Sequence, residues 1–368
     1  MQQILFVPLS VFQFTGGLEK FNRCFCKALD TIQQQNSAIN YTVYAIHDAK
    51  ADANYVNPQH FIAGLGNKFK SVWNIIKLAA KADTIIIGHS NLALPALIVK
   101  TLFPQKKYWV VAHGIEVWNA SPRVLHLLKK ANKILAVSQF TKSKLVAQGV
   151  NAAAITVFHN TIDPYFKQPQ QFDKPAYLQQ RYQLQSNATV LFALTRLNSN
   201  EQYKGYDTVI KAMPALLQQH PNLHFFIAGK ADPAEKERVE QLVAANGLQQ
   251  QVKLLGFIPD NELTDHFLLA DAFAMPSYGE GFGIVFIEAM ACGLPVLAGN
   301  KDGSTDALQN GALGILVNPF EESSVQQGLQ QLVQQVQQGI NKTQLQQQVN
   351  QHFGFTHFTN RLAALLRA

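Results

Sequence analysis

Short apolar runs alternate with longer segments of helical periodicity along most of the chain. In the first half, buried strands are predicted at ILFVPL, YTVYAI, TIIIGH, YWVVAHG, KILAVS and ITVFHN, with helices near residues 18–33, 71–81 and 139–148. Strands resume at TVLFALTRL, HFFIAG, QVKLLGFI, DAFAMPS and PVLAG. Parallel strands need crossover connections, which are usually helices. The alternation therefore predicts an α/β protein built on parallel sheets.

The chain is longer than one hydrophobic core usually serves. At 368 residues, we expect two doubly wound domains of comparable size. The stretch 163–185 contains three prolines and several glutamines, which is typical of a connection between domains. A second glutamine-rich stretch, residues 326–351, has apolar residues at helical spacing and is predicted to form a helix with a polar face.

The net charge of +7 is distributed unevenly. Residues 1–165 contain 17 Lys or Arg against 7 Asp or Glu, whereas the remainder is slightly acidic. The lysines cluster, several at helical spacing: Lys68, Lys70, Lys77, Lys81, Lys106, Lys107, Lys129, Lys130, Lys133, Lys142 and Lys144. Because the basic runs lack interleaved aromatics and any nucleic-acid motif, an anionic membrane leaflet is favoured over nucleic acid as the partner. The alternative is a solvated basic face with no partner.

Cysteine usage and hydropathy indicate the compartment. Cys24, Cys26 and Cys292 cannot all pair, and none belongs to a group with zinc-like spacing, so we expect a cytosolic protein without a structural metal. The apolar run at residues 4–7 has no basic segment before it and suits a first strand better than a secretion signal. The longest apolar stretch, residues 92–103, is too short and interrupted to span a bilayer.

The segment SYGEGFGIVFIEAMACGLP, residues 277–295, carries the strongest functional signal. Gly279, Gly281 and Gly283 precede an apolar helix, and backbone N–H groups at such a helix start can face an anion. Glu288 lies inside that helix among apolar residues, where a buried carboxylate needs a partner. Sugar or ribose hydroxyls are suitable donors to it. The alternative is a nearby Lys or Arg.

Other candidates follow predicted strands, where ligands of doubly wound domains bind. Arg196 ends TVLFALTRL and Lys204 lies eight residues on, so together they offer two cations to a diphosphate; the alternative for each is a surface ion pair. His113 follows another strand, and either a structural role or proton sharing with a hydroxyl fits it. Gly16 and Gly17 follow the first strand without forming a G-x-G-x-x-G motif. No Asp-x-Asp pair occurs, so a metal-independent site is expected.

Together these segments resemble the GT-B-fold glycosyltransferases, specifically the retaining enzymes of glycosyltransferase family 4. TGGLEK, AHGIEVW, TRL with YKGYD, HFFIAGK, LLGFIPDNEL and EGFGIVFIEAMACGLPV occur in the family's order over nearly the whole chain. The glutamate pair combined with the Arg/Lys pair is the specific part of the resemblance. Thr195, where the family often has Gly, and Asp306, where many members have Glu, are departures that remove no charge from the site.

The resemblance implies two doubly wound, Rossmann-like domains that face a central cleft. Residues 1–170 would form the acceptor-binding domain and residues 171–352 the domain that binds the nucleotide-sugar donor. Residues 353–368 would form a terminal helix that crosses back to the N-terminal domain.

The resemblance also implies how the C-terminal candidates bind the donor. Arg196 and Lys204 would hold the nucleotide diphosphate, and Glu288 would hold the ribose hydroxyls. Phe257 and Ile258 would flank the base. The donor sugar would contact one side chain and the backbone that follows it: Glu280, Gly281, Phe282, Gly283 and Ile284.

In the N-terminal domain, the resemblance implies that His113 bonds the donor sugar near its reacting carbon, while Gly16 and Gly17 allow close approach to the phosphates. The expected catalytic set is His113, Arg196, Lys204 and Glu280. No metal ligand is expected.

The implied reaction transfers a hexose, for example mannose or glucose, from a nucleotide-diphosphate sugar to a hydroxyl of a glycan or lipid-linked acceptor. The resemblance implies that the reaction retains the configuration at the anomeric carbon and needs no cofactor or metal. The enzyme would act in cell-surface polysaccharide or glycolipid synthesis, in the cytoplasm and at the inner face of the membrane. Two alternatives share the fold: a sugar-nucleotide epimerase, and an inactive nucleotide-sugar-binding scaffold. A nicotinamide dehydrogenase is less compatible because the glycine fingerprint is missing.

Overall fold

The computed structural model describes residues 1–367, apart from the side chain of Lys68; Ala368, the last residue of the predicted terminal segment, lies outside the described residues. The chain divides into two compact units. The N-terminal domain comprises residues 1–165 and the segment that begins at Phe353, and the C-terminal domain comprises Phe166–His352. The first domain is therefore discontinuous in sequence.

The N-terminal domain contains a seven-stranded parallel sheet of order β3-β2-β1-β4-β5-β6-β7. The strands are β1 (Gln2–Val7), β2 (Ile39–Ala45), β3 (Phe61–Ala63), β4 (Thr84–Ile87), β5 (Lys107–Ala112), β6 (Lys133–Ala136) and β7 (Ile155–Val157). The chain builds outward from β1 to β3 and then returns to β4 on the other side of β1. This reversal is the topological switch point at which doubly wound domains bind ligands.

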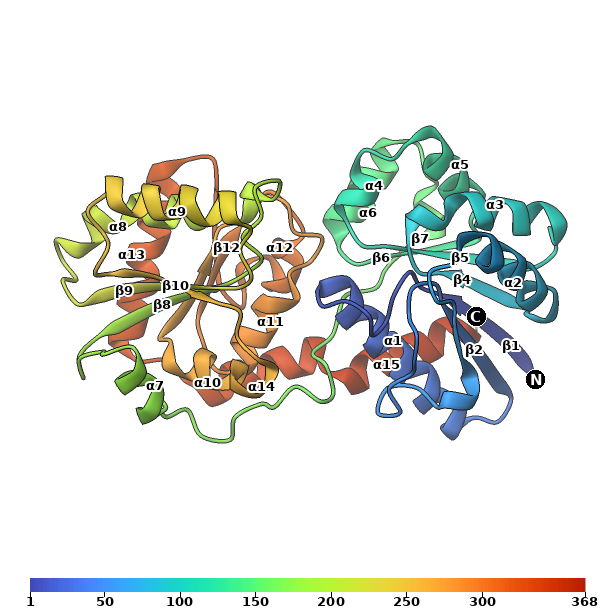
Figure 1. Ribbon diagram of the computed structural model, residues 1–368, viewed down its shortest axis with the longest axis horizontal. Coiled ribbons are helices and arrows are strands. Elements are labelled where there is room, and N and C mark those ends of the chain that lie inside the picture. The colour runs from blue at the N-terminus through green and yellow to red at the C-terminus, as the bar shows by residue number, and fades with distance from the viewer. Residues whose placement is uncertain (368) are drawn as a thin grey trace. The chain divides into compact units, whose positions relative to one another are not determined.

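Helices cover both faces of this sheet (Figure 1). One face carries α1 (Gly17–Gln35) and α15 (Phe355–Arg367); the other carries α2 (Lys68–Lys81), α3 (Ala93–Leu102), α4 (Ile115–Trp118), α5 (Pro122–Lys130) and α6 (Gln139–Ala147). Side chains alternate along each strand, so Leu5 and Val7 join the core under α2 to α6. Phe6 instead contacts Phe25 of α1, whose ring lies near that of Phe358 in α15.

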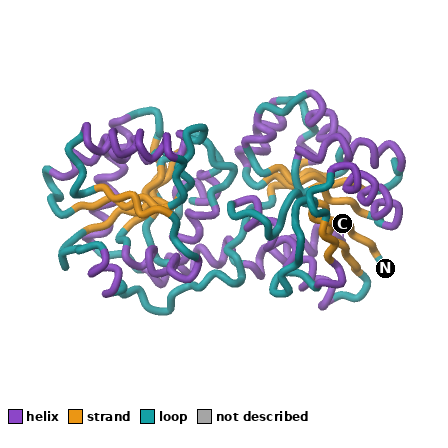
Figure 2. The backbone as a smooth tube through the Cα atoms, in the orientation of Figure 1, coloured by secondary structure: helices purple, strands orange, loops and turns teal. Residues whose placement is uncertain are grey.

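The C-terminal domain has a six-stranded parallel sheet of order β10-β9-β8-β11-β12-β13. Its strands are β8 (Thr189–Leu194), β9 (Leu223–Ala228), β10 (Val252–Gly256), β11 (Ala272–Met275), β12 (Val296–Gly299) and β13 (Ile315–Val317). Its helices are α7 (Ala176–Arg181), α8 (Tyr206–Leu217), α9 (Pro233–Ala245), α10 (Asp260–Leu269), α11 (Ile284–Ala291), α12 (Ser304–Ala307), α13 (Glu322–Gln338) and α14 (Lys342–Phe353). Figure 2 shows helices on both sides of each sheet, as the alternating pattern predicted.

Two details differ from the sequence-based expectations. The glutamine-rich stretch forms two helices, α13 and α14, because the chain turns at Gly339 with a positive φ of 86°. The strands β3 and β13, three residues each at sheet edges, were not predicted.

Three further findings concern membrane-spanning helices, metal-ligand groups and cysteines. Within residues 1–367, no helix combines the length and apolar character needed to cross a membrane. In that same part of the chain, no three His, Cys, Asp or Glu side chains gather as metal ligands. Cys24, Cys26 and Cys292 are buried, and none of the three forms a disulfide bond.

Candidate functional site

Two strand-end loops of the C-terminal domain lie against each other. Residues 195–205 follow β8, and residues 276–283 follow the adjacent strand β11. The Tyr278 N–H donates to the Tyr203 carbonyl at 3.0 Å. A Cβ added to Gly205 would lie 2.3 Å from the Pro276 carbonyl oxygen, and one added to Gly279 would lie 2.3 Å from the Tyr203 ring. Both glycines are therefore required for this close approach.

The approach of the two loops brings Lys204 to Glu280. Lys204 Nζ lies 2.7 Å from Glu280 Oε1, and only 13% and 16% of the two side chains are exposed. Burial alone would lower the pKa of Lys204, but the charge of Glu280 and the hydrogen bond to it raise that pKa above its usual value. Lys204 is therefore a fixed, protonated cation at the carboxyl end of the sheet.

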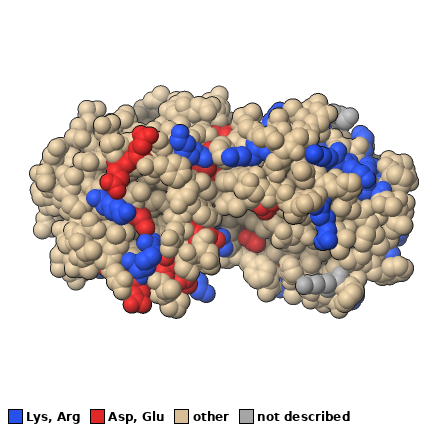
Figure 3. Space-filling view, turned by 90° about the horizontal axis from the view of Figure 1, so that it is seen from above, with Lys and Arg blue, Asp and Glu red and all other residues tan. Residues whose placement is uncertain are grey.

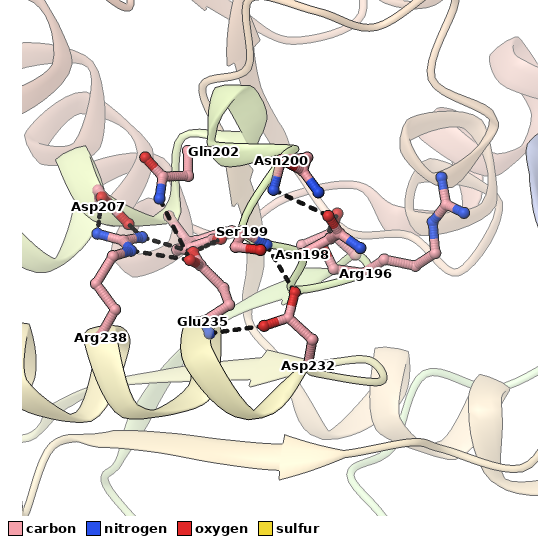
Figure 4. A network of polar contacts seen from close by, with 11 residues as sticks. Arg196, Asn198, Ser199, Asn200, Gln202, Asp207, Asp232, Glu235 and Arg238 are labelled. Atoms are coloured by element: carbon pink, nitrogen blue, oxygen red, sulfur yellow. Dashed lines mark hydrogen bonds and ion pairs between the residues drawn. The ribbon is translucent and has the colours of Figure 1, made fainter.

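Arg196 lies on the same loop as Lys204 but pairs with a different carboxylate. Its Nη2 donates to Glu201 Oε1 at 2.8 Å, and 66% of its side chain is exposed. Figure 4 shows the guanidinium extending away from the polar network under the loop. Both predicted cations thus lie on one loop, and each has an ion-pair partner of its own.

A polar network anchors this loop to helix α9 (Figure 4). Asp232, the N-cap of α9, accepts from the Ser199 N–H of the loop and from the Glu235 N–H, both at 2.8 Å. Buried Glu235 accepts from Arg238 Nε at 2.9 Å, and Arg238 donates through two nitrogens to Asp207 of α8 at 2.7 and 2.8 Å. None of these residues was singled out from sequence, although Asp-Pro-x-Glu at 232–235 is a capping-box signature.

Asp302 holds the second loop from the opposite side. Its Oδ2 accepts from the Glu280 N–H at 2.7 Å and from the Ser277 hydroxyl at 3.1 Å, while Oδ1 accepts from the Ser304 N–H at 2.9 Å. The Gly303 N–H donates to the Glu280 carbonyl at 2.8 Å, so residues 302 and 303 bind both backbone groups of Glu280. Burial, with a smaller contribution from the charge of Glu280, raises the pKa of Asp302 to about 7. Asp302 was not among the residues predicted from the sequence.

The second loop ends at the start of α11. Gly283 is the N-cap of this helix with φ 86°, flanked by buried Phe282 and Ile284, and Gly281 precedes them. Glu288, one turn further along, is 1% exposed. Burial and then the charge of Glu288 raise the pKa of Cys292 in the next turn. Anything that Glu288 binds therefore lies in a region from which water is largely excluded.

A cavity of about 310 Å³ opens at the carboxyl ends of β8, β9 and β10. It is lined by Leu197, Ile227, Gly229, Lys230, Ala231, Lys236, Leu254, Leu255, Gly256 and Phe257. Phe257 is 65% exposed at the surface of this cavity, whereas the neighbouring Ile258 is buried. The volume and the mixed apolar and cationic lining suit a small ligand.

In the N-terminal domain, three contacts hold the His113 ring. Nε2 donates to the Gly88 carbonyl at 2.8 Å, the ring lies edge-on to Phe21 at 5.0 Å, and it stacks near His89 at 6.0 Å. Burial lowers the pKa of His113 to about 4, so the ring is neutral at pH 7 and Nδ1 is its acceptor.

The loop that carries the paired glycines is tied to a buried carboxylate. Gly16 is the N-cap of α1 and Gly17 is its first residue. Asp48 accepts from three successive N–H groups, those of residues 11–13, at 2.7–2.8 Å. Asp48 was not among the candidates predicted from the sequence, and its three hydrogen bonds show that it shapes this loop.

Two family models match the chain and together cover most of both domains. Residues 16–166 match the model described as Glycosyltransferase Family 4, and residues 178–359 match the one described as Glycosyl transferases group 1. The chain belongs to the family 4 glycosyltransferases. The predicted family is thereby confirmed.

Curated relatives of this family 4 glycosyltransferase include two groups. A GDP-mannose-dependent alpha-(1-6)-phosphatidylinositol monomannoside mannosyltransferase of Mycobacterium tuberculosis is 31% identical over 218 residues, which are 56% of this chain and 55% of that relative. A D-inositol 3-phosphate glycosyltransferase of Corynebacterium aurimucosum is 24% identical over 333 residues, 89% of this chain and 69% of that relative. The chain thus spans about half the length of the first of these relatives.

Solved structures confirm the predicted GT-B fold. Anabaena HepE in complex with UDP and glucose superposes with a TM-score of 0.77 at 22% identity, over the full length of both chains. Sucrose-phosphate synthase from Thermosynechococcus elongatus superposes with a TM-score of 0.76 at 18% identity, over 100% of this chain and 98% of that one. At these identities the likeness concerns the fold of the family 4 glycosyltransferase.

The low pKa values of His89 and His113, both caused mainly by burial, predict a loss of stability on mild acidification. The unfolded chain binds protons near pH 6.5, whereas the folded domain excludes them until about pH 4, so stability is lost as the pH falls between these values. Between pH 7 and 5.5, the free energy of unfolding of His89→Gln should fall by about 1 kcal/mol less than that of the native chain. Urea unfolding followed by tryptophan fluorescence reports on this domain, because all three tryptophans lie in residues 1–165.

The matched control for this prediction is His126→Gln, which changes an exposed histidine of α5. It should leave the pH dependence of the native chain unchanged. A stability difference between native chain and His89→Gln that is the same at both pH values would contradict the prediction.

Proposed function

We propose that the protein transfers a hexose from a nucleotide-diphosphate sugar to a hydroxyl of a glycan or lipid-linked acceptor, with retention at the anomeric carbon and without a metal. The observation that carries the proposal is the Lys204–Glu280 pair at 2.7 Å, held between two strand-end loops. A fixed cation beside the glycine-rich start of α11 suits a diphosphate, because N–H groups at a helix start and a lysine both favour negative charge.

The proposed chemistry breaks the bond between the anomeric carbon and the diphosphate oxygen. A new bond from the acceptor oxygen forms on the same face, and the acceptor proton moves to the leaving diphosphate. Lys204 and Arg196 stabilise the charge that grows on that group, and Glu280 with the backbone of residues 281–284 positions the donor sugar. Glu288 accepts hydrogen bonds from the ribose hydroxyls, and Phe257 with Ile258 flanks the base beside the strand-end cavity.

The N-terminal domain contributes the remaining polar group. His113 is neutral with Nε2 bound to the Gly88 carbonyl, so Nδ1 accepts a hydrogen bond from a donor-sugar hydroxyl near the reacting carbon. Gly16 and Gly17, at the start of α1, leave room for the phosphates. The histidine orients the sugar and does not act as a general acid at neutral pH.

Donor and acceptor are proposed from relatives of known name. The mycobacterial relative is named for GDP-mannose and a phosphatidylinositol mannoside, and the HepE structure holds UDP and glucose. A hexose donor fits both names, and a lipid-linked acceptor fits the mycobacterial one. The basic N-terminal domain suits the anionic cytoplasmic face of a membrane, where such an acceptor would lie.

A thermal-shift panel of UDP, GDP, ADP and their sugar conjugates tests the donor site. A nucleotide at 100 times its dissociation constant adds about 2.7 kcal/mol, which raises the melting temperature of a domain of this size by roughly 5–10 °C. We expect one base to be selected and Glu288→Ala to abolish the shift. Glu240→Ala, on the exposed surface of α9, is the control and should keep it. No shift with any nucleotide would contradict the proposed donor site.

Product analysis separates the alternative functions. Free nucleotide together with a glycoside supports the transferase. A rearranged nucleotide sugar formed without an acceptor supports the epimerase, and tight binding without turnover supports the inactive scaffold.

A further inference from the structure

The helix layer on one face of the N-terminal domain has an unusual charge distribution. Helices α2, α3, α5 and α6 pack on the same side of the sheet, where their apolar residues share one core. Their sequences contain ten Lys or Arg and no Asp or Glu. Figure 3 shows basic side chains gathered over this domain, at the right of the view. The outer surface of these four helices is therefore positive. The fifth helix of the layer, α4, adds one carboxylate, Glu116, which accepts a hydrogen bond from the His113 N–H.

Two of these helices also expose stripes of large apolar side chains. On α2, Phe69 and Trp73 are four residues apart and 92% and 58% exposed. On α3, Leu94, Ile98 and Leu102 are also spaced by four and exposed. Helix α2 packs beside α3. The inward positions of both helices, among them Ile75 and Val99, are already filled by core residues, so the stripes face outward.

Cations and apolar groups are in contact on this surface. Lys77 Nζ lies 5.3 Å from the centroid of the Trp73 ring, and Lys70 and Lys81 are exposed on the same helix. Lys100 of α3 lies 4.5 Å over the Tyr108 ring, and its pKa is lowered by burial and by the neighbouring charge of Lys130. Aromatic rings that sit among lysines match the boundary between lipid headgroups and acyl chains.

The sequence-based statement that the basic runs lack aromatics is wrong for α2, where Phe69 and Trp73 lie between lysines. Aromatic and basic residues together also suit single-stranded nucleic acid. The aliphatic stripe of α3 decides between the two partners, because leucine and isoleucine offer no stacking surface to a base but gain from contact with acyl chains.

We infer that the outer face of α2 and α3 docks on an anionic bilayer, with Phe69 and Trp73 at headgroup depth and Lys70, Lys77 and Lys81 against lipid phosphates. This inference names the surface for the membrane association proposed above. It is independent of the donor chemistry, since vesicle binding is measured without nucleotide.

Sedimentation of the full chain with vesicles tests the docking face. The protein should bind vesicles that contain about one-third phosphatidylglycerol, not pure phosphatidylcholine, and should dissociate at high salt. Lys77→Gln/Lys81→Gln should weaken binding by about 25-fold, at about 5-fold per lysine. The control Lys211→Gln/Lys236→Gln makes the same charge change at exposed positions of α8 and α9, and should bind like the native chain. Equal binding by both double variants, or equal binding to neutral vesicles, would overturn the inference.

Phe69→Ser/Trp73→Ser tests the apolar contribution and should weaken binding by about 10-fold or more. Phe320→Ser, at an exposed aromatic of the C-terminal domain, is its control. Trp73 is the most exposed of the three tryptophans, all of which are described, so vesicles should shift the fluorescence to the blue, and Trp73→Phe should remove the shift. Two results would contradict membrane docking. One is sedimentation with vesicles without a blue shift of the tryptophan fluorescence. The other is displacement of the protein from vesicles by an oligonucleotide, together with normal vesicle binding by Phe69→Ser/Trp73→Ser.

The nucleotide thermal shift separates the two proposals. Phe69→Ser/Trp73→Ser should retain the full shift, because both residues belong to the N-terminal helix layer and not to the donor loops. Absence of vesicle binding would therefore refute the docking face and not the donor site. Absence of nucleotide binding would refute the donor site and not the docking face.

Discussion

Lys204→Ala should lower kcat/KM for sugar transfer by about 100- to 1,000-fold, the cost of removing one fixed donor from a charge-stabilising site. Lys204 is the less exposed of the two cations on its loop, and the adjacent Glu280 keeps it protonated. A cation in such surroundings stabilises a leaving diphosphate more strongly than an exposed one does. Arg196→Ala should also lower turnover. Initial rates with a fixed acceptor and varied donor give the measurement.

Two controls separate charge from structure. Lys211→Ala removes an exposed lysine of α8 in the same domain and should change neither rate nor melting temperature. Lys204→Ala leaves Glu280 without its partner, so the double variant Lys204→Ala/Glu280→Gln tests whether the unpaired carboxylate causes the loss. Recovery of activity in the double variant, or near-normal turnover in both Lys204→Ala and Arg196→Ala, would refute the role of Lys204 as a diphosphate-binding cation.

Asp302→Ala should lower kcat/KM by about 100-fold, although Asp302 is a positioning residue that need not touch the donor. The substitution leaves the Glu280 and Ser304 N–H groups and the Ser277 hydroxyl without their shared acceptor. The loop that carries Glu280 then shifts, and a displacement of about 1 Å at a reacting centre costs about that factor.

The pH dependence identifies Asp302 more specifically. Its pKa of about 7 lies above the usual 3.8, so the folded domain holds a proton that the unfolded chain releases. Its contribution to stability therefore falls as the pH rises from about 4 to 7, opposite in sign to that of the two histidines. Ionisation supplies both oxygens as acceptors for the Glu280 loop, so kcat/KM should rise through about pH 7.

Asp302→Asn should abolish both pH trends, while Asp260→Asn, at an exposed position of α10, should preserve them. An unchanged pH profile in Asp302→Asn would show that another group titrates.

The sequence predicted what depends on periodicity and on residue type. The principal strands follow from short continuous apolar runs, and the helix α1 follows from apolar residues at helical spacing. Glu288 was predicted to be buried because every neighbour in α11 is apolar. The strands β3 and β13 were not predicted because their apolar runs are only three residues long, FIA before Gly64 and ILV between Gly314 and Asn318. The equally short β7 was predicted because apolar Phe158 extends its run. The helix break at Gly339 was not predicted, because the polar residues on both sides of it give no sign of where one helix ends and the next begins.

Contacts between distant residues required the structure. Lys204 and Glu280 were both candidates, but they are 76 positions apart, and their ion pair follows from the adjacency of β8 and β11. Asp302 is an acidic residue in a turn, which usually lies in solvent. Only the direction of three surrounding donors shows that it supports the Glu280 loop.

The position of α15 has a consequence for biosynthesis. Phe358 of this helix packs against Phe21 and Phe25 of α1, yet the entire C-terminal domain lies between them in sequence. A ribosome that adds 5–20 residues per second needs about 10–40 s to translate the intervening domain. During this time α15 is not yet synthesised, so the aromatic side chains of α1 cannot pack against Phe358. The contiguous C-terminal domain is therefore able to complete its fold first, and the N-terminal domain reaches its final packing last, in the reverse of the usual vectorial order.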